Sequence, residues 1–143
     1  METITVRTST HAQFVDVTDR VRALVRDSGV ASGVVHLYVP HTTAAVTINE
    51  NADPSVVQDI LADLDRLVPE TQRYYRHEEG NSPGHTKSSL IGCSRALLIE
   101  DGRLVLGTWQ GIYFCEFDGP RTREMHVKIV SDPVGPAGPT AGR

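Results

Sequence analysis

Apolar and polar residues alternate along the first part of the chain. Over residues 3–8 the apolar side chains of Ile4 and Val6 stand between polar neighbours, and a second alternation follows over residues 13–17. A period of two predicts strands that bury one face and expose the other. Because only a short polar link separates the two runs, we expect them to pair with each other as a hairpin.

Two stretches have the spacing of amphipathic helices. The first begins after Asp16 or Thr18, either of which can cap it, and Gly29 is placed to end it. The second begins at Asp53, an N-cap followed by proline, and Pro69 closes it. Apolar residues recur at helical intervals in both, at Val17, Val21, Leu24 and Val25 and then at Val56, Val57, Ile60, Leu61, Leu64, Leu67 and Val68. We expect each helix to pack this face on a sheet.

Further runs rich in β-forming residues follow the helices. They lie at residues 33–39, 43–48, 95–100, 103–106, 112–117 and 124–130. Asp101 and Gly102 are typical of a hairpin turn, and residues 118–121 form a second turn signal. This order predicts an α+β fold with compact, sandwich-like antiparallel sheets and two main helices. We expect a single domain over residues 1–131 and a disordered Pro- and Gly-rich tail over residues 132–143.

Charge limits the classes of partner. The formal net charge of -4 argues against a nucleic-acid partner held by overall positive charge, although a local basic pocket stays open. Arg20, Arg22 and Arg26 on the first predicted helix form either a solvated face or a basic patch. No apolar run approaches the roughly 20 residues that cross a bilayer, and the first residues lack an apolar signal-peptide core. We therefore expect a cytoplasmic protein with no membrane partner.

The two cysteines, Cys93 and Cys115, are far apart in the sequence. Without a close pair they predict neither a disulfide framework nor a Cys-x-x-Cys metal site. We expect two reduced thiols that serve as small core residues.

The most polar stretch of the chain runs over residues 74–87. Gly80, Pro83 and Gly84 argue against a continuous helix or strand there, and the stretch holds two histidines, two carboxylates and an asparagine. A loop of this composition is either a functional loop on a rigid scaffold or a solvated loop with surface histidines.

Three histidines lie outside the apolar runs. His77 and His85 belong to the polar stretch, and His41 lies at the junction of two predicted strands. Three histidines and a carboxylate can bind a divalent metal, here Zn or Mg, and leave a position for water or substrate. The carboxylate candidates are Glu50, Glu78 and Glu79. We assign His77 and His85 first, and His41 third, as metal ligands or as catalytic proton-transfer groups.

A second group of polar residues lies beside turns and glycines. We expect substrate or anion binding from Asn81, Lys87, Ser88, Thr108, Gln110 and Arg121. Lysine, arginine and hydroxyl groups together can hold a phosphate, although each one alone is more often an ordinary surface or cap residue. Ser88 has no nucleophile elbow around it, which argues against a serine hydrolase.

Several segments together resemble the YjbQ-like family, also called the secondary thiamine-phosphate synthase family. They are His-Thr-Thr-Ala at 41–44, Asn-Glu-Asn-Ala-Asp-Pro at 49–54, the loop from His77 to His85, Lys-Ser-Ser at 87–89, Gly-Thr-Trp-Gln-Gly-Ile at 107–112 and Asp-Gly-Pro-Arg at 118–121. The resemblance implies a compact α+β fold with a β-sandwich, assembled as a homotrimer. It also implies a low thiamine-phosphate synthase activity, a transferase reaction that joins a pyrimidine pyrophosphate to a thiazole phosphate and releases pyrophosphate.

If that reaction holds here, each part of it needs particular residues. Lys87, Arg121 and a histidine-bound cation would neutralise the leaving pyrophosphate, and Trp109 would offer a ring surface. Two alternatives stay open. One is a non-catalytic trimer that binds a metal or a small phosphorylated metabolite, and the other is a metal-dependent hydrolase.

Overall fold

The computed structural model describes residues 1–133, which form eight strands and three helices. Their order is β1 (Glu2–Arg7), β2 (Gln13–Asp16), α1 (Thr18–Ser28), β3 (Gly33–Tyr38), β4 (Ala44–Glu50), α2 (Pro54–Leu67), α3 (Ser82–Ile91), β5 (Ser94–Glu100), β6 (Arg103–Leu104), β7 (Gln110–Glu116) and β8 (Thr122–Ser131). The α+β class is as expected, with three helices in place of two. The predicted tail lies outside the described residues from residue 134 onward.

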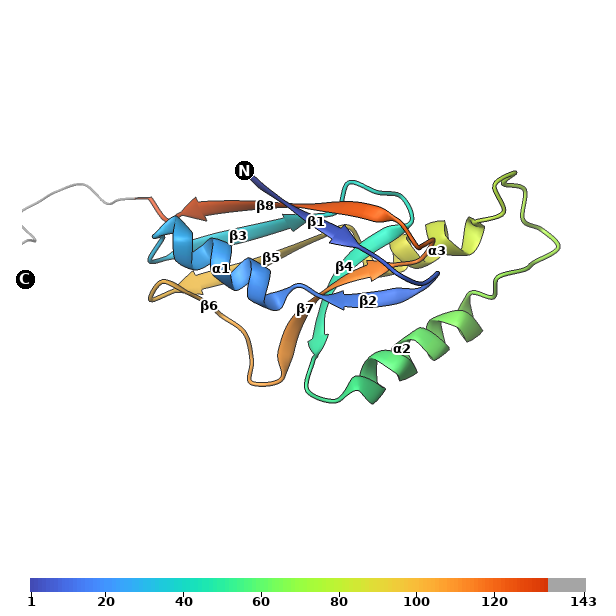
Figure 1. Cartoon of the computed structure of the whole chain (residues 1–143), viewed down its shortest axis with the longest axis horizontal. Coiled ribbons are helices and arrows are strands. Elements are labelled where there is room, and N and C mark those ends of the chain that lie inside the picture. The colour runs from blue at the N-terminus through green and yellow to red at the C-terminus, as the bar shows by residue number, and fades with distance from the viewer. Residues whose placement is uncertain (134–143) are drawn as a thin grey trace, which may run out of the picture.

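The strands form two antiparallel sheets. The larger has the order β1-β8-β3-β5-β6, and the smaller has the order β2-β7-β4. In Figure 1 the long strands of the larger sheet run across the upper part of the molecule, while β4 and β7 descend below them. The predicted hairpin is wrong, because β1 pairs with β8 and β2 pairs with β7. The polar link carries the chain from one sheet to the other, where the amide of Thr8 donates to the carbonyl of Arg121 at 2.9 Å.

One core joins the two sheets and α1. Val35 from β3, Val46 from β4 and Phe114 from β7 are fully buried in the same cluster. Val21 and Val25 of α1 complete it, as the helical spacing predicted. Burial of apolar surface from both sheets therefore holds them together.

The end of α1 and the β5–β6 turn lie where the sequence predicted them, but the N-cap of α1 is Val17 rather than Asp16 or Thr18. The Asp16 carboxylate accepts a hydrogen bond from the amide of Thr18 at 2.9 Å, and Gly29 ends α1 with a left-handed φ of 69°. Asp101 and Gly102 have φ values of 53° and 73°, the left-handed pair that a two-residue hairpin turn requires.

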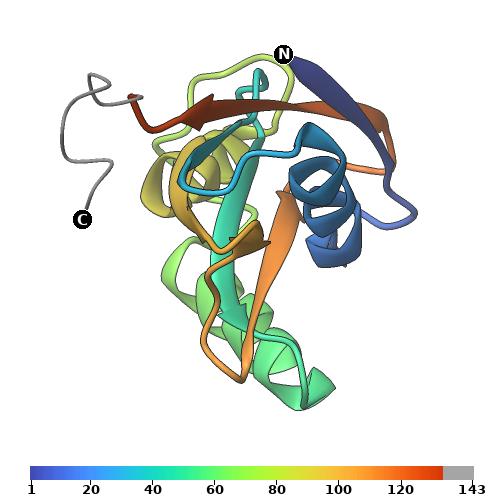
Figure 2. The ribbon, with the colours of Figure 1, turned by 90° about the vertical axis from the view of Figure 1, so that its left-hand side faces the viewer.

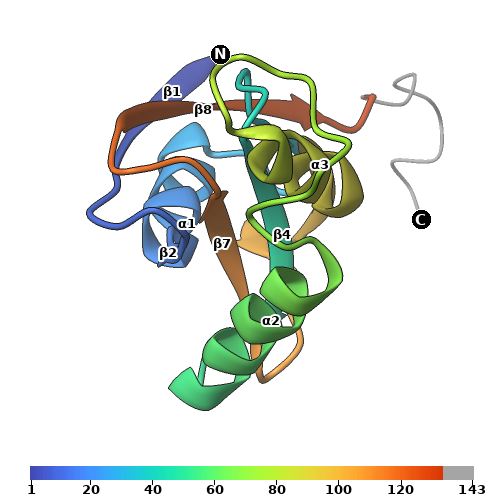
Figure 3. The ribbon, with the colours of Figure 1, turned by 90° about the vertical axis from the view of Figure 1, so that its right-hand side faces the viewer.

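The apolar stripe of α2 is only partly covered. Asp53 caps the helix, since its carboxylate accepts from the amide of Ser55 at 2.9 Å. Leu64 is buried against the smaller sheet, whereas Leu67 is 71% exposed. Figure 3 shows α2 below α3, at the lower edge of the molecule.

A helix, α3, occupies the second half of the stretch in which no helix was expected. Pro83 lies in its first turn, where no amide donor is needed. Gly84 lies where α3 approaches the smaller sheet, and a Cβ at this position would lie 3.0 Å from the carbonyl oxygen of Phe117 and 3.3 Å from a methyl carbon of Thr43. The residues taken as helix breakers therefore begin the helix and let it pack closely.

The described part of the chain has no helix that is both long and apolar enough to cross a membrane.

Candidate functional site

An open hollow of about 350 Å³ lies where the loop before α3 meets the link between β3 and β4 and the turn before β8. We call it the histidine hollow. Its lining includes His41, His77, Glu79, Asn81, His85 and Arg121. The structure thus brings all three candidate histidines to one place, together with two of the candidate binding residues.

Two of the histidines touch each other. The ring centroids of His77 and His85 are 5.1 Å apart, and the rings meet edge to face at 89°. His85 lies in the first turn of α3, and His77 lies in the loop that leads to it. Nε2 of His77 is also 3.9 Å from a carboxylate oxygen of Glu79. The hollow therefore presents two groups that can accept or donate protons, with a carboxylate beside one of them.

His41 has a fixed tautomer. The backbone amide of Glu124 donates to its Nε2 at 2.9 Å, so in the neutral ring the proton lies on Nδ1. Burial, and then the nearby charge of Arg123, lower the pKa of His41 below its ordinary value. His41 is therefore a neutral ring at pH 7 that can donate through Nδ1, while its Nε2 is already occupied.

A buried ion pair supports the floor of the hollow. Arg123 donates from Nε to one oxygen of Glu116 at 2.9 Å and from Nη2 to the other, and Nη2 also donates to the hydroxyl of Thr43 at 2.8 Å. Glu116, which is fully buried, further accepts from the hydroxyl of Thr8 at 2.7 Å. Burial alone would raise the pKa of Glu116, but these hydrogen bonds and the one from the amide of Asp118 hold it below its ordinary value.

A second, more exposed pair orients Arg121. Its Nη2 donates to the carboxylate of Asp118 at 2.9 Å, and its Nε donates to the carbonyl of the same residue at 2.9 Å. The side-chain amide of Asn81 donates to the same carboxylate at 2.8 Å. The Asp118 carboxylate therefore holds both candidate binding residues of this hollow.

The side chain of Asn81 does not make the hydrogen bond that is usual for an asparagine at a helix N-cap, here that of α3. Its NH₂ group faces two carboxylates, Asp118 at 2.8 Å and Glu79 at 3.5 Å, which fixes the orientation of the amide. Its side-chain carbonyl oxygen, Oδ1, is buried and has no hydrogen-bond partner in the described part of the molecule.

An adjoining hollow of about 500 Å³ shares His41, Thr42 and His85 with the first. Ser88 lines it, but its hydroxyl donates to the backbone carbonyl of Thr42 at 2.6 Å, so the side chain is held by the protein itself. Cys93 also lines it and is exposed, which makes the expectation of two core thiols wrong for Cys93. Cys115 is buried, as predicted.

Three candidate binding residues lie elsewhere. Lys87 is buried between α2 and α3, where its ammonium group pairs with Asp65. Thr108 and Gln110 lie near the far end of β7, and Gln110 accepts a hydrogen bond from the amide of Gly107 at 2.8 Å. In register Gln110 pairs with Glu50, at the opposite end of the small sheet from the hollow, so roughly 20 Å of strand separates the two places.

The sequence analysis missed three charged residues of the site, Glu116, Asp118 and Arg123. A signal was present for two of them. Glu116 lies in the apolar run 112–117, and Arg123 takes an inward position in the alternation of β8. Charged residues at core positions of strands are almost never fully buried unless they are paired.

The chain matches known proteins over nearly all of its described residues. The family model described as "UPF0047 protein YjbQ-like" matches residues 2–132. The UPF0047 protein YugU of Bacillus subtilis is 48% identical over 130 residues, covering 91% of this chain and 98% of its own. The UPF0047 protein MJ1081 of Methanocaldococcus jannaschii is 51% identical over 127 residues, covering 89% and 91%.

Solved structures agree with this match. A crystal structure of a yjbq/upf0047 family protein from Clostridium acetobutylicum is 52% identical, with a TM-score of 0.89, over 91% of this chain and 100% of its own. A YbjQ-like protein of unknown function from Sulfolobus solfataricus is 33% identical, with a TM-score of 0.87, over 92% and 96%. Both share the α+β fold with antiparallel sheets described above.

These comparisons do not support the predicted thiamine-phosphate synthase activity. The relatives named here carry only the UPF0047 designation or are described as of unknown function, and none is named for thiamine synthesis. Within residues 1–133, no group of three or more His, Cys, Asp or Glu side chains is arranged to hold a metal ion. The prediction of a thiamine-phosphate synthase with a metal-binding pocket is therefore wrong, and the metal-dependent alternatives are wrong with it. A physical reason is that the amide of Glu124 occupies Nε2 of His41.

Proposed function

The chain belongs to the UPF0047 YjbQ-like family, and from this premise and its site we propose that the protein is a small-molecule enzyme that works by general acid–base catalysis in the histidine hollow. The observation that carries the proposal is the contact between His77 and His85, whose ring centroids are 5.1 Å apart in that hollow. Imidazole exchanges protons near neutral pH, so one ring of a pair can accept a proton while the other donates one.

The surroundings of the pair favour a ligand with an oxygen anion, such as a carboxylate. Arg121 is half-exposed, and Asp118 takes hydrogen bonds from its Nε and Nη2, which leaves Nη1 for a ligand. His41 offers a second donor at Nδ1. The N–H groups of Nη1 can donate to a ligand carboxylate oxygen. In the proposed reaction Arg121 and His41 hold the ligand, and the histidine pair removes and returns a proton on it.

Isotope exchange follows the proton transfer itself, whatever product the reaction forms. Small carboxylic acids are incubated with the protein in D₂O, and the entry of deuterium into carbon-bound positions is followed by NMR. General acid–base groups contribute about 10²- to 10⁴-fold in rate. We therefore expect His85→Gln and His77→Gln to slow exchange on the responsive acid at least about 100-fold. His11→Gln, at an exposed position outside the lining of the hollow, is the matched control. Exchange that continues at the wild-type rate in His85→Gln would contradict the proposal.

We also propose that the chain assembles as a homotrimer. Support comes from the outer face of the larger sheet, where Tyr38, Leu98 and Val130 are 50%, 58% and 45% exposed. Val34 lies between Leu98 and Val130 in the strand register, so their apolar side chains form one row across β5, β3 and β8. Contact with other copies would bury this row. Light scattering at micromolar concentration tests the proposal, with Leu98→Glu expected to lower the mass. A wild-type monomer would refute it.

A further inference from the structure

A second hollow, of about 350 Å³, lies between α1 and the β5–β6 hairpin, away from the histidines. Arg22 and Arg26 enter it from α1, and Arg103 enters it from β6. We call it the arginine hollow. Figure 1 places α1 beside β6, and Figure 2 views the molecule from that side. We propose that the arginine hollow binds a ligand that carries two or more linked phosphate groups.

Three arginines from two elements line the hollow. Arg22 and Arg26 are four residues apart on α1, so they share one face of the helix. Arg103 begins β6 and lines the same hollow. Val25 and Leu104, both buried, lie at the base of the hollow between them. Three positive groups therefore surround a space with an apolar floor.

Little negative charge compensates this cluster. Arg26 pairs with Asp27 at 3.3 Å, whereas Arg22 and Arg103 have no carboxylate within 4.0 Å among the described residues. Asp101 is the one carboxylate in the lining. Two like charges at this helical spacing repel each other, and Arg103 of β6 adds a third positive charge to the hollow. A bound anion would remove this repulsion.

Glu100 is the residue most able to neutralise Arg103, because the two are paired in the β5–β6 register. Its carboxylate instead accepts a hydrogen bond from the hydroxyl of Ser32 at 3.4 Å. The chain has a formal net charge of -4, so the charge of this cluster is opposite in sign to that of the chain as a whole. This local excess of positive charge is what would attract an anion.

The number and spacing of the arginines favour linked phosphates over a single one. Guanidinium groups bind phosphate oxygens through parallel N–H donors, and arginines on two elements can engage phosphate groups at separate positions. A hollow of about 350 Å³ has room for more than one phosphate group. A diphosphate or triphosphate chain can reach from the α1 arginines to Arg103.

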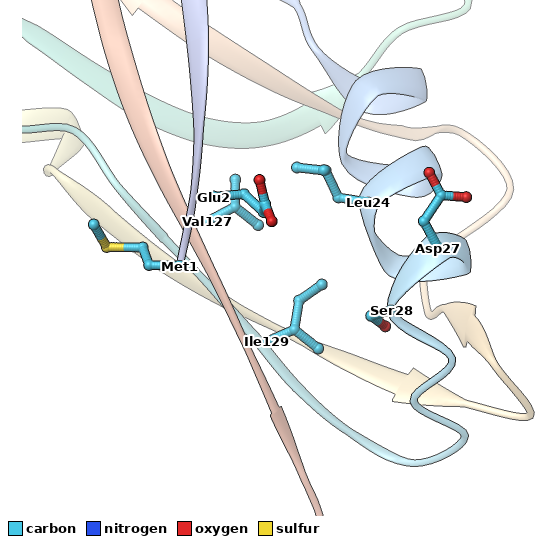
Figure 4. A pocket seen from close by; sticks show the side chains of 7 residues that line it. All are labelled: Met1, Glu2, Leu24, Asp27, Ser28, Val127 and Ile129. Carbon is cyan, nitrogen blue, oxygen red and sulfur yellow. The ribbon is translucent and has the colours of Figure 1, made fainter.

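A hollow on another side of α1 offers a comparison. It measures about 220 Å³ and is lined by Glu2, Leu24 and Asp27, with no Arg or Lys among its lining residues (Figure 4). Met1, the N-terminal residue, also lines it, so its positive amino group stands beside the carboxylates of Glu2 and Asp27. The same helix thus borders one hollow with three arginines and one with none, and the first fits the proposed ligand better.

Calorimetry with inorganic tripolyphosphate on the full chain tests this inference. At low salt we expect saturable binding of one ligand per chain, which weakens as ionic strength rises. The double variant Arg22→Gln/Arg103→Gln should lose at least about tenfold in affinity, since each charge-assisted hydrogen bond is worth about 1.5–3 kcal/mol. Arg20→Gln removes the same charge from the same helix outside the hollow, and we expect its affinity to stay within about twofold of wild type.

Four results would overturn the inference. The first is wild-type affinity in the double variant with an unchanged circular dichroism spectrum. The second is an equal loss in Arg20→Gln, which would show a diffuse charge effect. The third is loss of binding in His85→Gln, which would move the ligand to the histidine hollow. Orthophosphate is the ligand control, and binding as tight as that of tripolyphosphate would refute the preference for linked phosphates.

Discussion

Arg123→Met should destabilise the protein much more than the loss of an exposed charged group such as Arg121. The methionine keeps much of the volume of the arginine but removes its donors to Glu116 and to Thr43. Glu116 is fully buried and would remain as a carboxylate with donors only from Thr8 and the amide of Asp118. The change therefore leaves a buried charge without its counter-ion.

The size of the effect follows from burial on both sides of the pair. The side chains of Arg123 and Glu116 are 6% and 0% exposed. Removing one partner of such a pair costs about 3–5 kcal/mol. Arg121→Met breaks a pair whose arginine is 51% exposed, and exposed pairs contribute only about 0–1 kcal/mol. Urea unfolding followed by circular dichroism should separate the two variants clearly.

The pH dependence identifies the cause. In the wild type the lowered pKa of Glu116 means that its contribution is present above pH about 4.3, the ordinary value for glutamate, and is lost as pH falls through the folded-state pKa. Without Arg123, burial dominates and raises the pKa of Glu116, so the folded variant takes up a proton readily. The free energy of unfolding lost in Arg123→Met should therefore be largest at pH 7 and smaller near pH 4.

A double variant tests whether the unpaired charge causes the loss of stability. Replacing both partners, as in Glu116→Met/Arg123→Met, removes the unpaired charge and should recover at least half of the loss, because apolar replacements of buried pairs are often neutral. A cost below about 1 kcal/mol for Arg123→Met, or an equal cost at pH 4 and pH 7, would refute the reasoning.

Three further outcomes are expected. Native protein should react with a thiol reagent at Cys93 alone, since Cys93 is exposed while burial raises the pKa of the Cys115 thiol; two thiols per folded chain would contradict this. Gly111→Ala should lower the free energy of unfolding by about 1–3 kcal/mol in urea titrations, because the new Cβ would lie 2.3 Å from Nδ2 and 2.7 Å from Cβ of Asn51. Nitrogen-15 NMR at pH 7 should find His41 neutral with its proton on Nδ1, and its lowered pKa means that folded stability falls as pH drops below about 6.5; a neutral ring with its proton on Nε2 would count against the fixed tautomer.

Local signals in the sequence were enough to predict the helix ends and turns. Gly29 ends α1, and Asp53 caps α2, because capping depends only on residues within a few positions of each other. The pairing of β1 was not predictable in this way. Its alternation is satisfied by any partner that buries Ile4 and Val6, and β8, more than a hundred residues away, is the partner in the fold.

The same distinction applies to the site. Histidines outside apolar runs were candidates from composition alone, and the structure adds what their neighbours do. The hydrogen bond from the amide of Glu124 to His41 joins residues 83 positions apart, so no spacing rule reveals that this ring nitrogen is occupied. Gln110 shows the converse. Its neighbours in sequence resemble a functional segment, yet the antiparallel register of β7 carries it to the far end of the sheet from His85.

The pairing of β1 with β8 also has a kinetic consequence. Glu2 pairs with Val127, and β2 pairs with β7. Neither N-terminal strand can therefore form its hydrogen bonds until almost the whole described chain has left the ribosome. At roughly 5–20 residues per second, synthesis leaves both strands unpaired for several seconds. Domains dominated by such long-range contacts fold in about milliseconds to seconds rather than microseconds. During translation we therefore expect a chaperone to bind β1 at its exposed apolar side chains, Ile4 and Val6.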